Sequence, residues 1–343
     1  MIKPLRKALC AWGALTCAIA LAPSRATSAG RPGDVGSSLQ ADGAWHPFRP
    51  KTDPARPDPP PAQSPNQGST IRVQTNLVSI LASVIDDKGK PVADLPESAF
   101  QLFEEGVPQK IERFEAETNR PVDLALMIDS SASTYKDLKF ELEASAHFIR
   151  QVVRPGDSLC VFEVSEQVTQ IGDFSDDVPR LQNAVRKIGA GTGTSIYDAV
   201  VLGSNQLRRR PAGRRRAIVF VTDAGETTSG SKFEDARRAA IASDELIYTI
   251  VIRPIKNENG RNTGGEHALN TITDSTGGNM FILDDLGQIE SMFDEIDREL
   301  RTQYLLGYYP QPTPPPDSDR HVQVKVNGNY TLSYRKEYFT ARQ

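Results

Sequence analysis

The residues with the clearest chemical potential are a carboxylate and two hydroxyls that directly follow one apolar segment. Residues 121–133 read PVDLALMIDSSAS, an apolar run that ends abruptly at Asp129, Ser131 and Ser133. Such a run, followed by a polar loop and a helical pattern, predicts a strand buried on both faces. Ligands of open α/β sheets bind outside the carboxyl ends of the strands. Because all three side chains are hard oxygen donors, they suit Mg²⁺, Mn²⁺ or Ca²⁺ rather than zinc.

Two further polar sites stand where a parallel sheet would bring them to the same edge. Residues 189–194 form a glycine-rich loop, GAGTGT, that ends in Thr194 and precedes a helical pattern. Asp223 follows the strongly apolar strand predicted at residues 217–222. We expect these groups to converge with Asp129 on one rim, where the glycines let the backbone pass close to a bound ion.

These motifs resemble those of a known family. The segment DSSAS at residues 129–133 matches the DxSxS motif of the von Willebrand factor type A (VWFA) family, and the residues around Thr194 and Asp223 look like its later motifs. More narrowly, the chain resembles the secreted VWFA-related proteins common in acidobacteria. Those proteins carry a segment similar to residues 94–106 before the A domain and one similar to residues 303–308 after it.

The resemblance implies a metal-ion-dependent adhesion site (MIDAS) that holds Mg²⁺, or else Mn²⁺ or Ca²⁺. Three hydroxyls would act as ligands and two carboxylates would act directly or through water; the residues implied are Asp129, Ser131, Ser133, Thr194 and Asp223. An ion with few direct anionic ligands keeps positive charge, and a protein partner's Asp or Glu can complete its octahedron. One departure is Ala224, where the family has glycine. Beside it, Glu226 is a candidate for contact with the ion through water.

Three functions remain open at this point. The favoured one is a secreted binding module that grips a protein partner through the ion and is not an enzyme. The second is a structural envelope protein whose metal site has degenerated, which only Ala224 supports. The third and least favoured is a metal-assisted hydrolase, since an ion held mainly by hydroxyls is a poor catalyst candidate. Taken singly, each of these residues would more simply be a turn former or helix cap. Asp198 is expected to brace the Thr194 loop, and the arginine-rich residues 208–216 to be a solvated loop.

The order of the predicted elements indicates the fold class. Strands and helices alternate over residues 121–302, which predicts a Rossmann-like, mainly parallel sheet with helices on both faces. Residues 71–116 and 303–339 have β patterns, and each is too short to fill a core of its own. We therefore expect one small β-sandwich-like domain built from both halves, with the α/β domain inserted. Turn residues predict hairpins that pair residues 100–104 with 110–115 and residues 322–326 with 330–334.

The beginning of the chain predicts its location. Residues 1–29 have the charged start, short apolar segment and small residues of a secretory signal peptide, and residues 30–70 form a Pro-rich linker. We expect a secreted, periplasmic or cell-envelope protein with no stable membrane span after cleavage. The net charge of −4 gives no footprint for nucleic acid. Three cysteines and four scattered histidines build neither a zinc site nor a disulfide framework.

Overall fold

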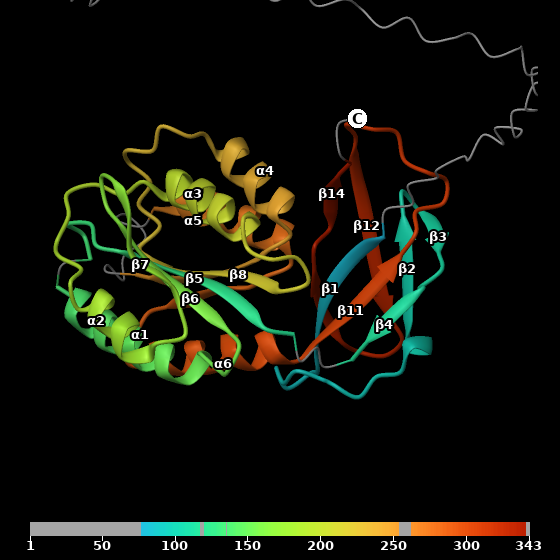
Figure 1. The fold of residues 1–343 in the computed structure, drawn as a ribbon, viewed down its shortest axis with the longest axis horizontal. Coiled ribbons are helices and arrows are strands. Elements are labelled where there is room, and N and C mark those ends of the chain that lie inside the picture. The colour runs from blue at the N-terminus through green and yellow to red at the C-terminus, as the bar shows by residue number, and fades with distance from the viewer. Residues whose placement is uncertain (1–76, 117–119, 135, 254–261, 341–343) are drawn as a thin grey trace, which may run out of the picture. The chain divides into compact units, whose positions relative to one another are not determined.

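The computed structural model describes residues 77–116, 120–134, 136–253 and 262–340. The predicted leader and linker, and a strand-like stretch at residues 71–75, lie outside the described residues. Figure 1 shows the described part as one large sheet between helices and two smaller sheets.

The apolar runs of the middle of the chain form one six-stranded sheet. Strands covered on both faces need apolar residues at nearly every position, and all eight residues of the central strand are buried. In sheet order the strands are β10 (Met280–Leu283), β9 (Leu246–Ile252), β8 (Arg215–Thr222), β5 (Val122–Asp129), β6 (Ser158–Val164) and β7 (Val168–Ser175). Neighbouring strands are parallel except for the edge strand β7, which runs antiparallel to β6.

Helices cover both faces of this sheet (Figure 1). One face packs against α1 (Leu138–Val152), α2 (Val178–Val185) and α6 (Ile289–Arg301). The other packs against α3 (Ile196–Arg208), α4 (Phe233–Ser243) and α5 (Thr263–Thr276). Alternate residues of β5 serve the two cores, so that Leu126 faces the first and Met127 the second. The predicted fold class is confirmed. None of the helices in the described residues is long and apolar enough to cross a membrane.

Two four-stranded sheets combine strands from before and after the α/β segment. The first has the order β13 (Thr331–Tyr334), β1 (Val78–Ile85), β11 (Gln303–Tyr308) and β4 (Arg113–Glu115). The second has the order β14 (Glu337–Phe339), β12 (Asp319–Val326), β2 (Phe100–Glu104) and β3 (Val107–Gln109). Short 3₁₀ helices span Glu97–Ala99 and Leu286–Gln288. Both sheets contribute to one buried cluster, which contains Ile80, Leu102, Tyr304 and Val324.

The two predicted hairpins are wrong in their pairing. β2 pairs with β3 across the turn at Glu105 and Gly106, whereas β4 lies beside β11 in the other sheet. β12 pairs with β2 and β14, and β13 pairs with β1. The residues between β12 and β13 therefore carry the chain from one sheet to the other. The partner of each short strand is decided by burial of its apolar face in the common core, which a local turn signal does not record.

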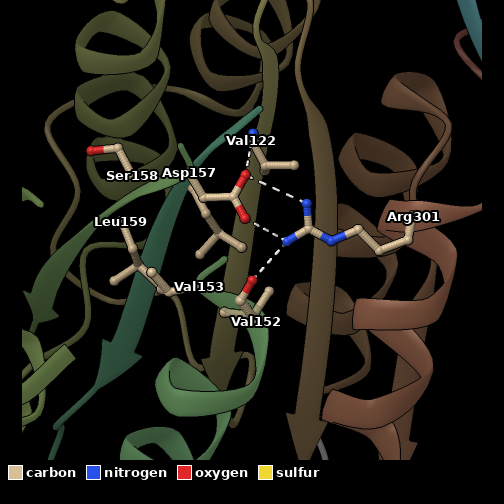
Figure 2. A pocket seen from close by; sticks show the side chains of 8 residues that line it. Val122, Val152, Val153, Asp157, Ser158, Leu159 and Arg301 are labelled. Atoms are coloured by element: carbon tan, nitrogen blue, oxygen red, sulfur yellow. Dashed lines mark hydrogen bonds and ion pairs between the residues drawn. The ribbon is translucent and has the colours of Figure 1, made fainter. Parts of the chain in front are cut away.

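At the end of the large sheet opposite Asp129, buried Asp157 forms an ion pair with half-buried Arg301 (Figure 2). Asp157 accepts hydrogen bonds from the backbone N–H groups of Val122 at 2.8 Å and Arg154 at 3.0 Å. One guanidinium nitrogen of Arg301 lies 2.6 Å from the Asp157 carboxylate and also donates to the Val152 carbonyl at 2.6 Å. The pair thus ties the ends of α1 and α6 to the start of β5.

The arginine-rich segment is partly built into the fold, which corrects its prediction as a solvated loop. The fully buried carboxylate of Asp123 forms salt bridges with Arg210 at 3.1 Å and with Arg214 at 2.8 Å. Arg215 is only 4% exposed and donates to the Arg120 carbonyl at 3.2 Å. These three arginines are directed to internal partners because a buried charge needs a bonded counterpart.

Candidate metal centre

Asp129 ends β5 with its side chain fully buried, and its two carboxylate oxygens have different donors. The Ser131 N–H donates to Oδ1 at 2.9 Å, and the Thr222 hydroxyl donates to Oδ2 at 2.6 Å. Thr222 is the last residue of the adjacent strand β8, so this bond joins the ends of two central strands. Sequence reasoning placed Thr222 in the motif that contains Asp223 but gave it no role of its own. The available signal was a hydroxyl residue at the end of an otherwise apolar strand, directly before Asp223.

The turn after Asp129 brings two hydroxyls together. Ser131 is buried and Ser133 is exposed, and their Oγ atoms lie 3.0 Å apart. The Thr134 hydroxyl donates to the carbonyl oxygens of Ser131 at 3.0 Å and Asp129 at 3.3 Å. These bonds close the turn just before α1 begins, so the backbone fixes where the two serine side chains stand.

The glycine-rich loop is bonded to both neighbouring loops. Gly191 donates to the Ser130 carbonyl at 2.6 Å, and a Cβ at Gly191 would lie 2.4 Å from the Ser165 Cβ, so only glycine fits there. The carbonyl of buried Thr194 accepts the Thr227 N–H at 2.9 Å, and the Thr194 N–H donates to the Thr227 hydroxyl at 2.8 Å. Among the described residues, none is hydrogen-bonded to the Thr194 hydroxyl.

In the loop after β8, Ala224 adopts a backbone conformation that is typical of glycine. Half-buried Asp223 accepts the Gly225 N–H on Oδ1 at 3.0 Å. Ala224 has a φ of 65°, in the left-handed region that glycine enters without strain, and its side chain is fully buried. The Ala224 N–H donates to the Thr222 hydroxyl at 3.0 Å. An alanine in this conformation stores strain of about 1–2 kcal/mol.

Two acidic residues have roles other than those predicted. One oxygen of Glu226, the residue predicted to contact the ion through water, accepts the N–H groups of Ile196 at 2.8 Å and Tyr197 at 3.2 Å, which begin α3. Both of its oxygens also bind Ser229. It therefore caps the positive end of α3. Asp198 accepts the N–H groups of residues 230 and 231 at 2.8 Å each, so it braces that loop rather than the Thr194 loop.

The electrostatics of the site favour a cation. Burial raises the pKa of the Asp129 carboxyl to about 6, and the nearby charge of Asp223 adds to this effect, against the lowering by the hydrogen bonds from Thr222 and Ser131. A buried carboxylate beside a second negative charge is stabilised in its ionised form by a nearby cation.

The structure brings the predicted residues into three connected loops. Asp129, Ser131 and Ser133 share one turn, Thr194 is joined to the loop that follows Asp223, and Thr222 links Asp129 to the start of that loop. The donor set is three hydroxyls and two carboxylates, the hard oxygen ligands that Mg²⁺ and Ca²⁺ take. Within the described ranges, no group of three or more His, Cys, Asp or Glu side chains is placed to hold a metal.

A comparison with protein families identifies the family of the segment that holds the candidate site. The model of the von Willebrand factor type A domain matches residues 124–226, which contain all the predicted site residues. The chain carries a domain of the von Willebrand factor type A family. Domains of this family typically bind protein partners, so this VWFA domain is a protein-interaction module. A comparison with curated proteins finds no match.

Solved structures similar to the chain include three bacterial proteins. The von Willebrand factor type A protein from Catenulispora acidiphila is 12% identical, with 79% of this chain and 75% of that chain covered and a TM-score of 0.46. The vWF domain of the type V pili tip protein Mfa5 from Porphyromonas gingivalis is 12% identical over 53% and 96% of the two chains, with a TM-score of 0.42. An aerotolerance-related membrane protein from Bacteroides fragilis is 20% identical over 52% and 98%, with a TM-score of 0.41.

Proposed function

We propose that this VWFA domain binds a partner protein through a divalent cation at a MIDAS-type site. Asp129, Ser131, Ser133, Thr194 and Asp223 would hold Mg²⁺, or Mn²⁺ or Ca²⁺ in its place. The bound cation would offer a Lewis-acidic position to an Asp or Glu carboxylate of the partner. The protein's own groups orient the hydroxyls and bury the carboxylate beneath them. The proposal gives the cation a binding role and no reaction, so the protein is not an enzyme.

One distance carries the proposal. In an octahedral Mg²⁺ shell with bonds of about 2.1 Å, neighbouring ligand oxygens lie about 3.0 Å apart. The Oγ atoms of Ser131 and Ser133 are hydrogen-bonded to each other at 3.0 Å, the separation that two neighbouring ligands of the ion would also have, and the buried Asp129 carboxylate fixes the same turn. The Thr194 hydroxyl, which binds no described residue, supplies a further ligand from the adjoining loop.

The geometry of the Ala224 loop weighs against the alternative of a degenerate structural site. The main argument for degeneration is that alanine replaces a glycine, which would reshape the loop. The backbone at Ala224 nevertheless has the positive φ that a glycine adopts readily, and its N–H is bonded to Thr222, the residue that also binds Asp129. The replacement therefore adds strain while the loop stays connected to the site.

Thermal melts of the chain in EDTA, Mg²⁺, Mn²⁺ and Ca²⁺ test the proposal. An ion at about one hundred times its dissociation constant should add roughly 2.7 kcal/mol to the free energy of unfolding. Asp129→Ala should abolish this gain, and Asp87→Ala, which changes an exposed turn carboxylate, should keep it. If no divalent ion stabilises the parent, or if Asp129→Ala responds like the parent, the site assignment is wrong.

The proposed setting is outside the cytoplasm, either secreted or in the cell envelope. It rests on the signal peptide predicted at residues 1–29, which lie outside the described residues. Sequencing the N-terminus of the protein recovered from an expressing cell checks this part. An uncleaved Met1 terminus in the cytoplasmic fraction would contradict it.

A further inference from the structure

A buried carboxylate that sequence reasoning did not single out lies one turn into α1, within electrostatic range of Asp129. Glu141 is fully buried, in the same stripe of the helix as Leu138, Ser145 and Phe148, which face the interior. It follows the DxSxS turn by little more than two helical turns of sequence. Its side chain is therefore turned to the interior of the protein with the other residues of this stripe.

The polar atoms of this stripe have no hydrogen-bond partner in the part of the chain that the structure describes. Among the described residues, none is hydrogen-bonded to either carboxylate oxygen of Glu141 or to the hydroxyl of Ser145, four residues further along the helix. Ser145 is also fully buried. Leaving a buried carboxylate unbonded is strongly unfavourable, so groups of this kind are normally paired with a cation or with ordered water.

The charges around Glu141 identify what it faces. Burial, and to a smaller extent the charges of Asp129, Asp137 and Asp223, together raise the pKa of the Glu141 carboxyl to about 8. Two of these three are candidate ligands, so Glu141 lies within electrostatic range of the site. The salt bridges of the described residues include none with Glu141. A cation at the candidate site would be the positive charge for this group.

We infer that Glu141 is an ion-positioning residue, whose carboxylate holds water bound to the divalent cation from the interior side. This inference rests on the proposed function, because it needs an ion at Asp129. Water can bridge the two because the stripe offers several polar atoms, Glu141 Oε1 and Oε2 and Ser145 Oγ, and a buried water requires two to four partners. Groups that orient the ligands of a metal from behind typically change its affinity by about 10- to 100-fold.

Isothermal titration of the full chain with Mn²⁺ and with Mg²⁺ tests the inference. Glu141→Gln keeps the size of the side chain and removes its charge, and Glu141→Met also removes its polarity. Glu143→Gln makes the same chemical change on the exposed side of the same helix. We expect Glu141→Gln and Glu141→Met to weaken binding about 10- to 100-fold. Glu143→Gln should bind like the parent, and thermal melts in EDTA should show all three variants folded.

The outcomes separate this inference from the proposed function. If the parent binds ions and Glu141→Gln binds them equally well, Glu141 is only a buried acid and the inference is wrong, while the binding site stands. If the parent binds neither ion, both fail. If both Glu141 variants unfold in EDTA, the residue is needed for the fold itself and the inference is also wrong.

Discussion

The cap that Glu226 places on α3 predicts a specific loss when it is removed. Its carboxylate receives the N–H groups of Ile196, Tyr197 and Ser229 and the Ser229 hydroxyl, at 2.8, 3.2, 2.9 and 2.8 Å. Ser195, at the cap position of the helix, makes no capping bond, since its hydroxyl pairs with Glu166 and Thr228. Glu226 thus satisfies N–H groups that α3 cannot satisfy itself.

The magnitude follows from the kinds of bond lost in Glu226→Ala. Loss of a capping side chain costs about 0.5–2 kcal/mol, and a hydrogen bond to a charged group contributes about 1.5–3 kcal/mol. These contributions do not add, and water can reach the half-buried site, so we expect a loss of about 2–4 kcal/mol. Glu226→Gln keeps one acceptor oxygen and should lose about 1 kcal/mol. The stabilisation by Mg²⁺ should also fall, because the cap joins the loops of Thr194 and Asp223.

Urea denaturation in EDTA and in Mg²⁺ measures both effects. Glu143→Ala, an exposed position on α1, is the control and should stay within about 0.5 kcal/mol of the parent. A loss below about 0.5 kcal/mol for Glu226→Ala would refute the reasoning, because the four bonds would then contribute nothing to the folded state.

Two further predictions concern buried groups. Burial raises the pKa of Glu299 from 4.5 to about 7, although a hydrogen bond from Asn279 partly offsets this. The folded protein therefore holds this proton more tightly than the unfolded chain. The stability that Glu299 contributes is present below pH 4.5 and is lost as the pH rises through 7. Urea denaturation should show Glu299→Gln gaining up to about 3 kcal/mol on the parent between pH 4.5 and pH 8, and an unchanged difference would contradict this. Ala224→Gly relieves the backbone strain, which stabilises the fold, and removes a buried methyl group, which destabilises it. Its free energy of unfolding should therefore stay within about 1 kcal/mol of the parent, and ion binding should persist. Ala224→Val, β-branched at positive φ, should lose more than about 2 kcal/mol, and equal stability of the two variants would show that the backbone is not held there.

The sequence predicts the α/β fold well because burial on both faces leaves a direct record. Every residue of strand β9 is buried, and α6 buries Ile289, Phe293, Ile296 and Leu300 at helical spacing. The predicted hairpin pairings were wrong because strand pairing depends on residues that are distant in the sequence. A turn at residues 327–329 is visible locally, but the partners of β12 and β13 lie far away in the sequence, in β2 and β1.

The motifs of the candidate site could be predicted from the sequence, but the hydrogen bonds that hold its loops in place could not. Asp129, Ser131 and Ser133 are contiguous, so one strand end places them together, although their role as ligands stays a prediction. The capping role of Glu226 was not predicted because its partners, the first N–H groups of α3, are brought to it only by the folded loops. Glu141 carried a usable signal, since it stands three residues after Leu138 and four before Ser145, in the register of the buried face.

The pairing of β4 with β11 has a consequence for the order of folding. β4 is the last strand before the VWFA domain and β11 the first after it, and Leu305 of β11 is paired with Glu115 of β4. If the VWFA domain were unfolded, forming that pair would require closing a loop of nearly two hundred residues, with an entropy cost that rises with loop length. Once the domain has folded, its own packing, with the Asp157–Arg301 pair, already holds the two ends near each other. The α/β segment would therefore act as the template on which the strands before and after it meet, and refolding should show the two four-stranded sheets forming last.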